Sequence, residues 1–146
     1  MRSIDTEALI DASPLAVWDI LVDFDRYHEW NPFIPRGAGR PEVGTTLVLE
    51  MRAPGDKPRT VRPTVVVASP GEHLRWRGTL SVPGLFAGRH EFILEPLGAA
   101  GTRVRHREDF TGLLVPLLGG ALKKTEQGFY AFNEALKKRA EQSARR

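Results

Sequence analysis

Strand-like segments separated by glycine and proline constrain the fold of this chain more than any other feature. They cover residues 45–53, 59–68, 72–81, 86–95 and 102–111. The sequences between them, such as "APGDKP" and "PLGAAG", are typical of hairpin loops. Pro63 lies inside the second segment and predicts an edge strand or a bulge there, because proline cannot donate a hydrogen bond to a neighbouring strand. The pattern as a whole predicts an antiparallel sheet.

A further strand and two short helices are expected before these segments. Residues 3–12 form the predicted strand. Ser13 and Pro14 then begin a short helix, because serine caps a helix N-terminus and proline suits its first position. A second short helix is expected to end near Trp30, since Pro32 biases the residue before it away from helical geometry.

A long helix is predicted over about residues 116–142. One buried stripe recurs along it in steps of four and three, made of Leu118, Leu122, Thr125, Phe129, Phe132 and Leu136. Gly128 interrupts this helix at a cost of about 1 kcal/mol relative to alanine. The glycine therefore either lets the sheet pack closely or leaves room for something else. The order of elements predicts an α+β fold, in which the long helix covers the concave face of a curved antiparallel sheet, within a single domain of residues 1–146.

Composition narrows the classes of protein and of site. The 146 residues contain no cysteine, which excludes disulfides, thiolate metal sites and a thiol nucleophile. No run of about 18 apolar residues occurs, and the N-terminus does not read as a signal peptide, so we expect a cytoplasmic protein without a membrane span. The net charge is +3, but acidic residues are interleaved with the basic ones, which favours a solvated surface over a nucleic-acid site. The glycines form no phosphate-binding loop, and we expect no cofactor and no metal.

Hairpin turns fix the register of the last three predicted strands. With turns at residues 98–101 and 81–85, every inward side chain meets another inward one, as the two-residue period of a strand requires. The predicted inward pairs are Leu94 with Val104, Phe92 with His106, His90 with Glu108, Leu80 with Phe86, Gly78 with Gly88, Trp76 with His90 and Leu74 with Phe92. The outward face then places Glu91 between Arg75 and Arg107, where opposite charges across strands are mildly stabilising.

Two histidines and a glutamate therefore lie on the inward face of the predicted sheet. His90 and Glu108 are neighbours, with Cβ atoms about 5 Å apart, and His106 lies in the next row. These residue types fit a hydrogen-bonded structural cluster with bound water, or a polar patch that orients a ligand in an apolar pocket. They also fit a general acid–base pair, or a metal triad, which Trp76 and Phe92 would crowd.

Five stretches of the sequence resemble the START-like superfamily, also called SRPBCC, and its polyketide cyclase/dehydrase-type branch. They are "ASPLAVWDILVDFDRYHEWNPF", "HLRWRGTL", "RHEFILEP", "GTRVRHREDFTGLL" and "GFYAFNEALKKRAE". The resemblance covers essentially the full chain and implies a helix-grip fold, with a cavity for hydrophobic or aromatic small molecules between the sheet and the C-terminal helix. It implies a cavity lining of Trp30, Phe33, Leu47, Leu49, Met51, Trp76, His90, Phe92, His106, Glu108, Gly128, Phe129 and Phe132. Members of the branch share no single catalytic motif, so the resemblance assigns no catalytic role.

The function predicted from these observations is the binding of a hydrophobic or aromatic small molecule, lipid-like or polyketide-like. One alternative is a polyketide cyclase or dehydratase that uses His90, His106 and Glu108 for acid–base chemistry. Another is a protein-interaction domain in which the cavity is vestigial. The sequence leaves open the identity of the ligand and the oligomeric state, a homodimer included.

Overall fold

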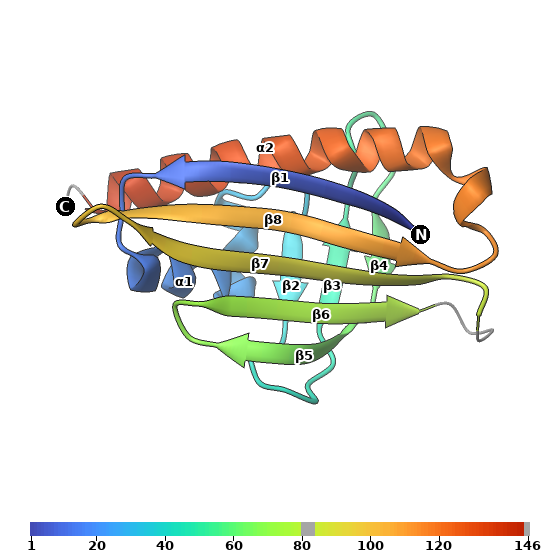
Figure 1. Ribbon diagram of the computed structural model, residues 1–146, viewed down its shortest axis with the longest axis horizontal. Helices are drawn as coiled ribbons and strands as arrows, with labels where there is room; N and C mark the ends of the chain where they lie inside the picture. The colour runs from blue at the N-terminus through green and yellow to red at the C-terminus, as the bar shows by residue number, and fades with distance from the viewer. Residues whose placement is uncertain (80–83, 145–146) are drawn as a thin grey trace.

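The computed structural model describes residues 1–79 and 84–144, and it is an α+β fold (Figure 1). The first half contains β1 (Arg2–Ile10), α1 (Pro14–Leu21), the short 3-10 helix η1 (Phe24–Glu29), β2 (Arg36–Ala38), β3 (Val48–Met51) and β4 (Arg59–Val61). The second half contains β5 (Thr64–Ser69), β6 (His73–Thr79), β7 (Ala87–Leu97), β8 (Gly101–Thr111), the 3-10 turn η2 (Val115–Leu117) and α2 (Gly119–Ala144).

The described strands form two antiparallel sheets. The larger sheet has the order β1-β8-β7-β6-β5, and the smaller one has the order β2-β3-β4. In Figure 1 the strands of the smaller sheet run across those of the larger sheet, behind it, and α2 runs along β1. The long helix predicted beside a curved antiparallel sheet is thus confirmed.

The predicted register of the last three strands is confirmed wherever it can be checked. His90 lies opposite Glu108, and Phe92 lies opposite His106. On the other side of β7, Trp76 lies opposite His90. The predicted pairing of Leu80 lies outside the described residues. Three neighbouring strands therefore aim one row of polar and aromatic side chains into the interior.

The predicted strand over residues 59–68 is wrong as a single element. It is divided into β4 and β5, which belong to different sheets, and Pro63 lies between them. The carbonyl of Pro63 accepts a hydrogen bond from the Leu47 amide at 2.8 Å, and a bulge follows between Val65 and Val67. Because proline has no N–H to give to a ladder, the chain changes sheets at this residue.

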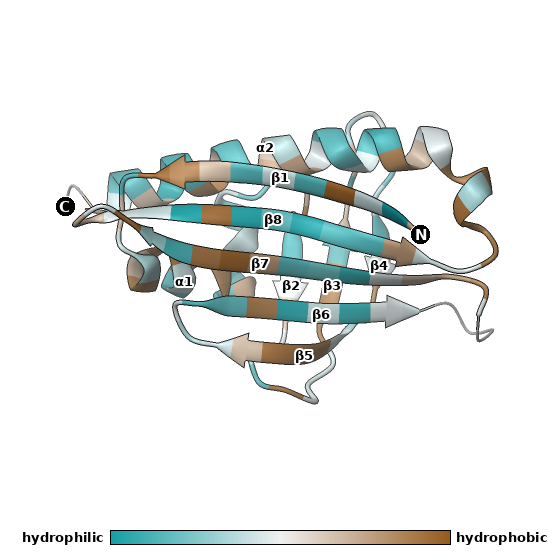
Figure 2. Ribbon diagram, in the orientation of Figure 1, coloured by the Kyte–Doolittle hydropathy of each residue, from teal (hydrophilic) through white to brown (hydrophobic). Residues whose placement is uncertain are grey.

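Other boundaries also differ from the sequence-based expectations. The strand expected over residues 45–53 is confined to β3, and β2 was not predicted from the sequence. The long helix begins at Gly119, three residues later than expected, because η2 occupies the apolar lead-in. In the predicted buried stripe of this helix, Leu118 and Thr125 are only half-buried. The other four residues are buried as predicted: Leu122, Phe129, Phe132 and Leu136. Figure 2 shows the resulting hydrophobic and hydrophilic bands along α2.

Local capping explains where the first helices begin and end. The Ser13 hydroxyl accepts a hydrogen bond from the Ala16 amide at 3.2 Å, and Pro14 occupies the first turn, as predicted. After η1, the buried side chain of Asn31 accepts hydrogen bonds from the amides of Phe33 and Ile34 at 3.1 and 2.8 Å. This amide side chain turns the backbone so that Phe33 enters the core.

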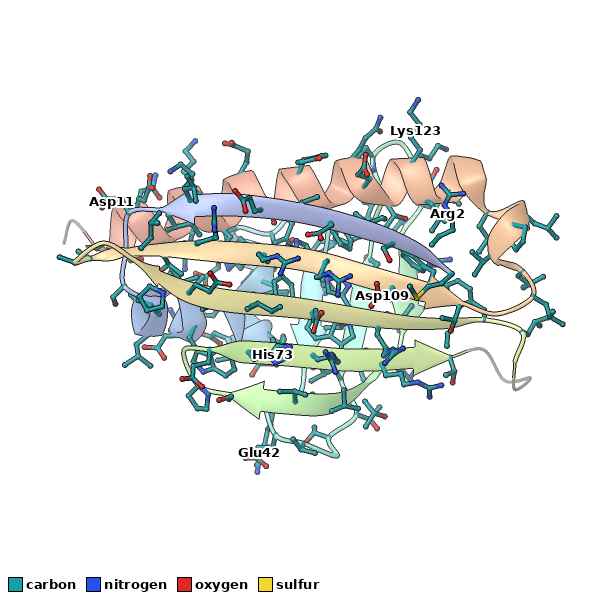
Figure 3. The ribbon with its side chains drawn as sticks, viewed as in Figure 1. Arg2, Asp11, Glu42, His73, Asp109 and Lys123 are labelled. Carbon is teal, nitrogen blue, oxygen red and sulfur yellow. The ribbon has the colours of Figure 1, made fainter. Side chains whose placement is uncertain are left out.

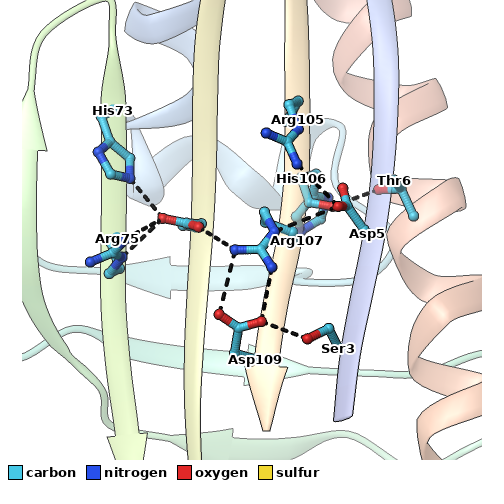
Figure 4. Close-up of polar contacts among 10 residues, drawn as sticks. Ser3, Asp5, Thr6, His73, Arg75, Arg105, His106, Arg107 and Asp109 are labelled. Carbon is cyan, nitrogen blue, oxygen red and sulfur yellow. Dashed lines mark hydrogen bonds and ion pairs between the residues drawn. The ribbon is translucent and has the colours of Figure 1, made fainter. Parts of the chain in front are cut away.

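A charged network covers the outward face of the larger sheet (Figures 3 and 4). Glu91 is only 4% exposed and accepts hydrogen bonds from His73 Nε2 at 2.8 Å, from Arg75 at 2.9 and 2.7 Å and from Arg107 at 2.7 Å. Burial by itself would raise the pKa of Glu91, but the bonds from His73, Arg107 and Arg75 outweigh it and lower the pKa from 4.5 to about 2.

Acid is therefore expected to weaken the fold through Glu91. Because the folded-state pKa lies below the unfolded value, the stabilisation is complete above about pH 4.5 and is lost as the pH falls toward 2. Glu91→Gln should lower the free energy of unfolding by about 2 kcal/mol at neutral pH and by much less near pH 3, in urea titrations. Glu95→Gln, on the same face but exposed, should stay within about 0.5 kcal/mol at every pH. Parallel pH curves for wild type and Glu91→Gln would contradict this account.

Candidate functional site

A chain of hydrogen bonds connects residues of β1, β7, β8 and α2 in the interior. His90 Nε2 lies 2.7 Å from His106 Nε2, and His106 Nδ1 lies 2.8 Å from Asn133 Oδ1. Asn133 Nδ2 donates to Thr6 Oγ1 at 2.9 Å, and the Thr6 hydroxyl donates to the carbonyl of His106 at 2.8 Å. We call Thr6, His90, His106, Glu108 and Asn133 the buried histidine cluster.

Aromatic rings enclose the two imidazoles. Phe129 of α2 stacks on His106 with ring centroids 3.9 Å apart. Phe92 of β7 also stacks on His106, with ring centroids 4.3 Å apart. Trp76 of β6 stacks on His90 at 4.6 Å. Both histidines are at most 1% exposed. The sheet and α2 thus bury the imidazoles between apolar faces, where a charge is costly.

This burial keeps His106 neutral. Desolvation lowers the pKa of His106 well below its ordinary value of 6.5, and the neighbouring His90 lowers it further. The hydrogen bond to Asn133 acts in the opposite direction and is outweighed. His106 is therefore a neutral link in the cluster.

Glu108 is the member of the cluster that reaches solvent. Its side chain is 14% exposed, and its Oε1 lies 3.3 Å from His90 Nδ1. That distance is within the range of an ion pair, yet Nδ1 makes no well-aligned hydrogen bond to any described residue. The other carboxylate oxygen lies over Gly88, where an added Cβ would overlap it. The absence of a side chain at Gly88 thus makes room for the carboxyl group.

The remaining predicted lining residues lie in the same core around this cluster. Trp30 is half-buried and packs edge-on against Phe132 at 5.5 Å, and Phe33 packs against Phe129 at 5.7 Å. The ring of Phe33 also occupies the space that Gly128 leaves on α2, since an added Cβ there would overlap it. Residues in and beside β3 complete the set: Leu47 and Leu49 are buried, and Met51 is half-buried.

Sequence reasoning missed Thr6 and Asn133 as partners of the histidines. Both left a signal in the sequence. Thr6 alternates onto the inward face of β1, and Asn133 follows Phe129 by four residues, which places its amide on the buried stripe of α2. A polar residue on an apolar stripe needs a hydrogen-bonding partner, and His106 supplies it.

The structure also bears on metal sites, membrane spans and surface pockets. Among residues 1–79 and 84–144, no group of three or more His, Cys, Asp or Glu side chains is arranged to hold a metal ion. The described helices include none that is both long and apolar enough to cross a membrane. A shallow surface pocket of about 380 Å³ lies beside Leu9, Leu97 and Lys137, and no member of the buried histidine cluster lines it.

The antiparallel sheet around a long C-terminal helix, with polar groups facing inward, defines a protein of the START-like, helix-grip class. The chain belongs to the polyketide cyclase/dehydrase and lipid transport family, whose model matches residues 1–141. The resemblance expected from the sequence is thereby confirmed. By sequence, no curated protein matches the chain.

Solved structures share the fold over nearly the whole chain. A START superfamily protein from Mycobacterium smegmatis is 22% identical, with a TM-score of 0.74 and coverage of 96% of this chain and 97% of that chain. The ZhuI aromatase/cyclase from a Streptomyces species is 18% identical, with a TM-score of 0.77 and coverage of 98% and 95%. Norcoclaurine synthase from Thalictrum flavum is 13% identical, with a TM-score of 0.76 and coverage of 98% and 96%. Because these sequence identities are low, the similarity establishes a shared fold and not a shared function.

Proposed function

We propose that this protein binds a hydrophobic, aromatic or lipid-like small molecule between its larger sheet and α2. The observation that carries the proposal is the position of Glu108, a partly exposed carboxyl group that joins a cluster of buried imidazoles enclosed by aromatic rings. Ligand pockets typically combine such apolar walls with a few polar groups that fix orientation. Membership of a family that includes lipid transport supports the same function.

In this proposal the rings supply affinity and Glu108 supplies orientation. Trp76, Phe92 and Phe129 offer flat apolar faces, which favour aromatic ligands by offset or edge-on contact. These rings contact one another and the imidazoles directly, so a ligand enters by displacing side chains, beginning beside Gly88 and Glu108.

Binding of a fluorescent apolar probe tests this proposal. Aminoanthracene should bind the purified protein in the micromolar range and quench the fluorescence of Trp76, and mass spectrometry of native extracts should find a small apolar molecule. Trp76→Phe should remove most of the quenching, whereas Trp18→Phe in α1 should retain it. An absence of both probe binding and extracted ligand would contradict the proposal and favour a protein-interaction domain.

A second candidate function is catalysis, as in a polyketide cyclase or dehydratase. The contact between Glu108 and His90 favours it, because a carboxyl group beside an imidazole can hold and release a proton. The carboxylate would take a proton from a carbon flanked by two carbonyl groups. The carbanion would then form the ring-closing bond to a third carbonyl carbon, whose oxygen takes up the proton. Loss of the new hydroxyl group and a proton from the neighbouring carbon as water would leave a carbon–carbon double bond in the ring.

The two glycines that face each other across β6 and β7 give a matched test of this chemistry. Gly88→Ala places a methyl group where the Glu108 carboxyl lies, whereas a methyl group at Gly78 meets only Pro63 at an ordinary 3.8 Å. With a poly-β-ketone thioester as substrate, Gly88→Ala and Glu108→Gln should each lower kcat by at least about tenfold, and Gly78→Ala should leave it unchanged. Equal rates for all four proteins would exclude Glu108 as the catalytic group.

A further inference from the structure

One backbone carbonyl determines the direction of the hydrogen bonds that run from Thr6 through Asn133 and His106 to His90. The carbonyl oxygen of His106 can only accept, and the Thr6 hydroxyl lies 2.8 Å from it. A threonine hydroxyl has a single proton, so Thr6 uses it on this carbonyl. Its oxygen can then only accept a bond from Asn133, which lies 2.9 Å away.

The orientation of the Asn133 amide is therefore fixed. Its NH₂ group must face Thr6, and its oxygen must face His106 Nδ1 at 2.8 Å. The reverse orientation would leave the amide oxygen without a donor at Thr6, because the hydroxyl proton is already used. Since the amide oxygen only accepts, His106 carries its proton on Nδ1.

The same logic passes from His106 to His90. A neutral imidazole with its proton on Nδ1 has a lone pair on Nε2, and the burial of His106 keeps the ring neutral. The 2.7 Å contact between the two Nε2 atoms then requires that His90 donates. His90 thus has a proton on Nε2, and the state of its Nδ1 is set by Glu108.

We propose that Thr6 and Asn133 are positioning residues that make Glu108 and His90 share one transferable proton, and that this pair selects ligands with an acidic hydroxyl group, a phenol or an enol. The inference rests on the proposed function and names its ligand class. His90 Nδ1 is buried without an aligned hydrogen bond to any described residue, and the Glu108 carboxyl group, with Oε1 3.3 Å away, is placed to share a proton with it.

The surroundings of the pair leave this proton few other partners. Trp76 of β6, Phe92 of β7 and Phe129 of α2 contact the His90 ring, and none of the three titrates. The titratable neighbour is His106, which already donates to Asn133 and accepts from His90. The proton is therefore exchanged through the exposed side of Glu108, where a hydroxyl of a ligand would donate to the carboxylate.

A hydroxyl on an aromatic ring fits both parts of the site. Its ring stacks on the aromatic walls, and its acidic proton forms a charge-assisted hydrogen bond to Glu108, which is stronger than a bond between neutral groups. A hydrocarbon of the same shape would use only the walls.

Ring-nitrogen chemical shifts of the two histidines test the proposed proton positions without any ligand. In the wild type, His106 should be protonated only at Nδ1, and His90 should be protonated at Nε2. Thr6→Val should convert His106 to a mixture of tautomers, because the Asn133 amide can then turn over. Thr102→Val is the matched control, since Thr102 is also a buried threonine that donates to a backbone carbonyl, that of Ala12 at 2.7 Å, and it should change neither tautomer.

Either of two results would overturn the inference: wild-type His106 protonated at Nε2, or a folded Thr6→Val protein with unaltered tautomers. The wild-type measurement decides the matter even if the variant does not fold.

Paired titrations with naphthol and naphthalene test the ligand class. Wild type should bind naphthol at least about tenfold more tightly than naphthalene, and Glu108→Leu should reduce this preference to within about threefold. Equal wild-type affinities for the two would overturn the inference but leave the proposed function standing. Failure of both to bind, together with aminoanthracene, would overturn the proposed function itself.

Discussion

Replacing Phe129 with alanine is expected to lower the free energy of unfolding by about 4 kcal/mol. Phe129 has no exposed surface, stacks on His106 at 3.9 Å and contacts Phe33 and His90. Its removal leaves a cavity against two imidazoles, and water that enters this cavity should raise the pKa of His106 toward its ordinary value. Urea unfolding measures the stability, and the ring proton shifts of His106 measure its titration.

The next residue in α2 provides the control. Tyr130 is 53% exposed, so Tyr130→Ala should change stability by no more than about 0.5 kcal/mol. A loss of less than about 2 kcal/mol for Phe129→Ala would mean that the layer between α2 and the sheet is not closely packed. In that case space for a ligand would already exist next to His106.

Gly112→Ala is expected to cost about 3 kcal/mol, because two unfavourable effects combine at this position. Gly112 has a φ of +119°, which residues with a side chain rarely adopt. A Cβ there would also lie 2.5 Å from the carbonyl oxygen of Leu85 and 2.8 Å from the Cα of Phe86, both of them backbone atoms that cannot rotate away. The bonds from Leu113 to Gly84 and from Leu114 to Leu85 hold the two segments together at this point.

Gly44 separates the two effects. It has a φ of +91°, but an added Cβ would meet nothing within 4 Å. Gly44→Ala should therefore cost about 1 kcal/mol, the conformational contribution alone. Equal losses for the two variants in urea unfolding would show that the close approach of residues 84–86 does not limit the choice of residue at position 112.

The part of the fold that depends on alternation could be predicted from the sequence. A strand has a period of two, so placing two hairpin turns was enough to align His90 with both Trp76 and Glu108. The outward charges agreed with the same alignment, since it placed Glu91 between Arg75 and Arg107. Where inward and outward patterns agree, a one-residue slip would violate both of them at once.

The parts that depend on docking between distant elements could not be predicted. Asn133 and Thr6 are 127 residues apart, and their contact exists only because α2 packs beside β1. The ring of Phe33 reaches Gly128 through a loop whose path no periodic pattern encodes. The change of sheet at Pro63 was visible only as an interruption, because proline excludes a ladder hydrogen bond without specifying the next partner of the chain.

The pairing of β1 with β8 has a consequence for how the molecule assembles. Thr6 bonds to His106 across 100 residues, and α2 follows β8, so the contacts that orient the imidazoles are among the longest in sequence separation. Long-range contacts close slowly, because the chain loses loop entropy before it gains any interaction. On a ribosome, the polar interior therefore matures after the hairpins β5–β6 and β7–β8 have formed.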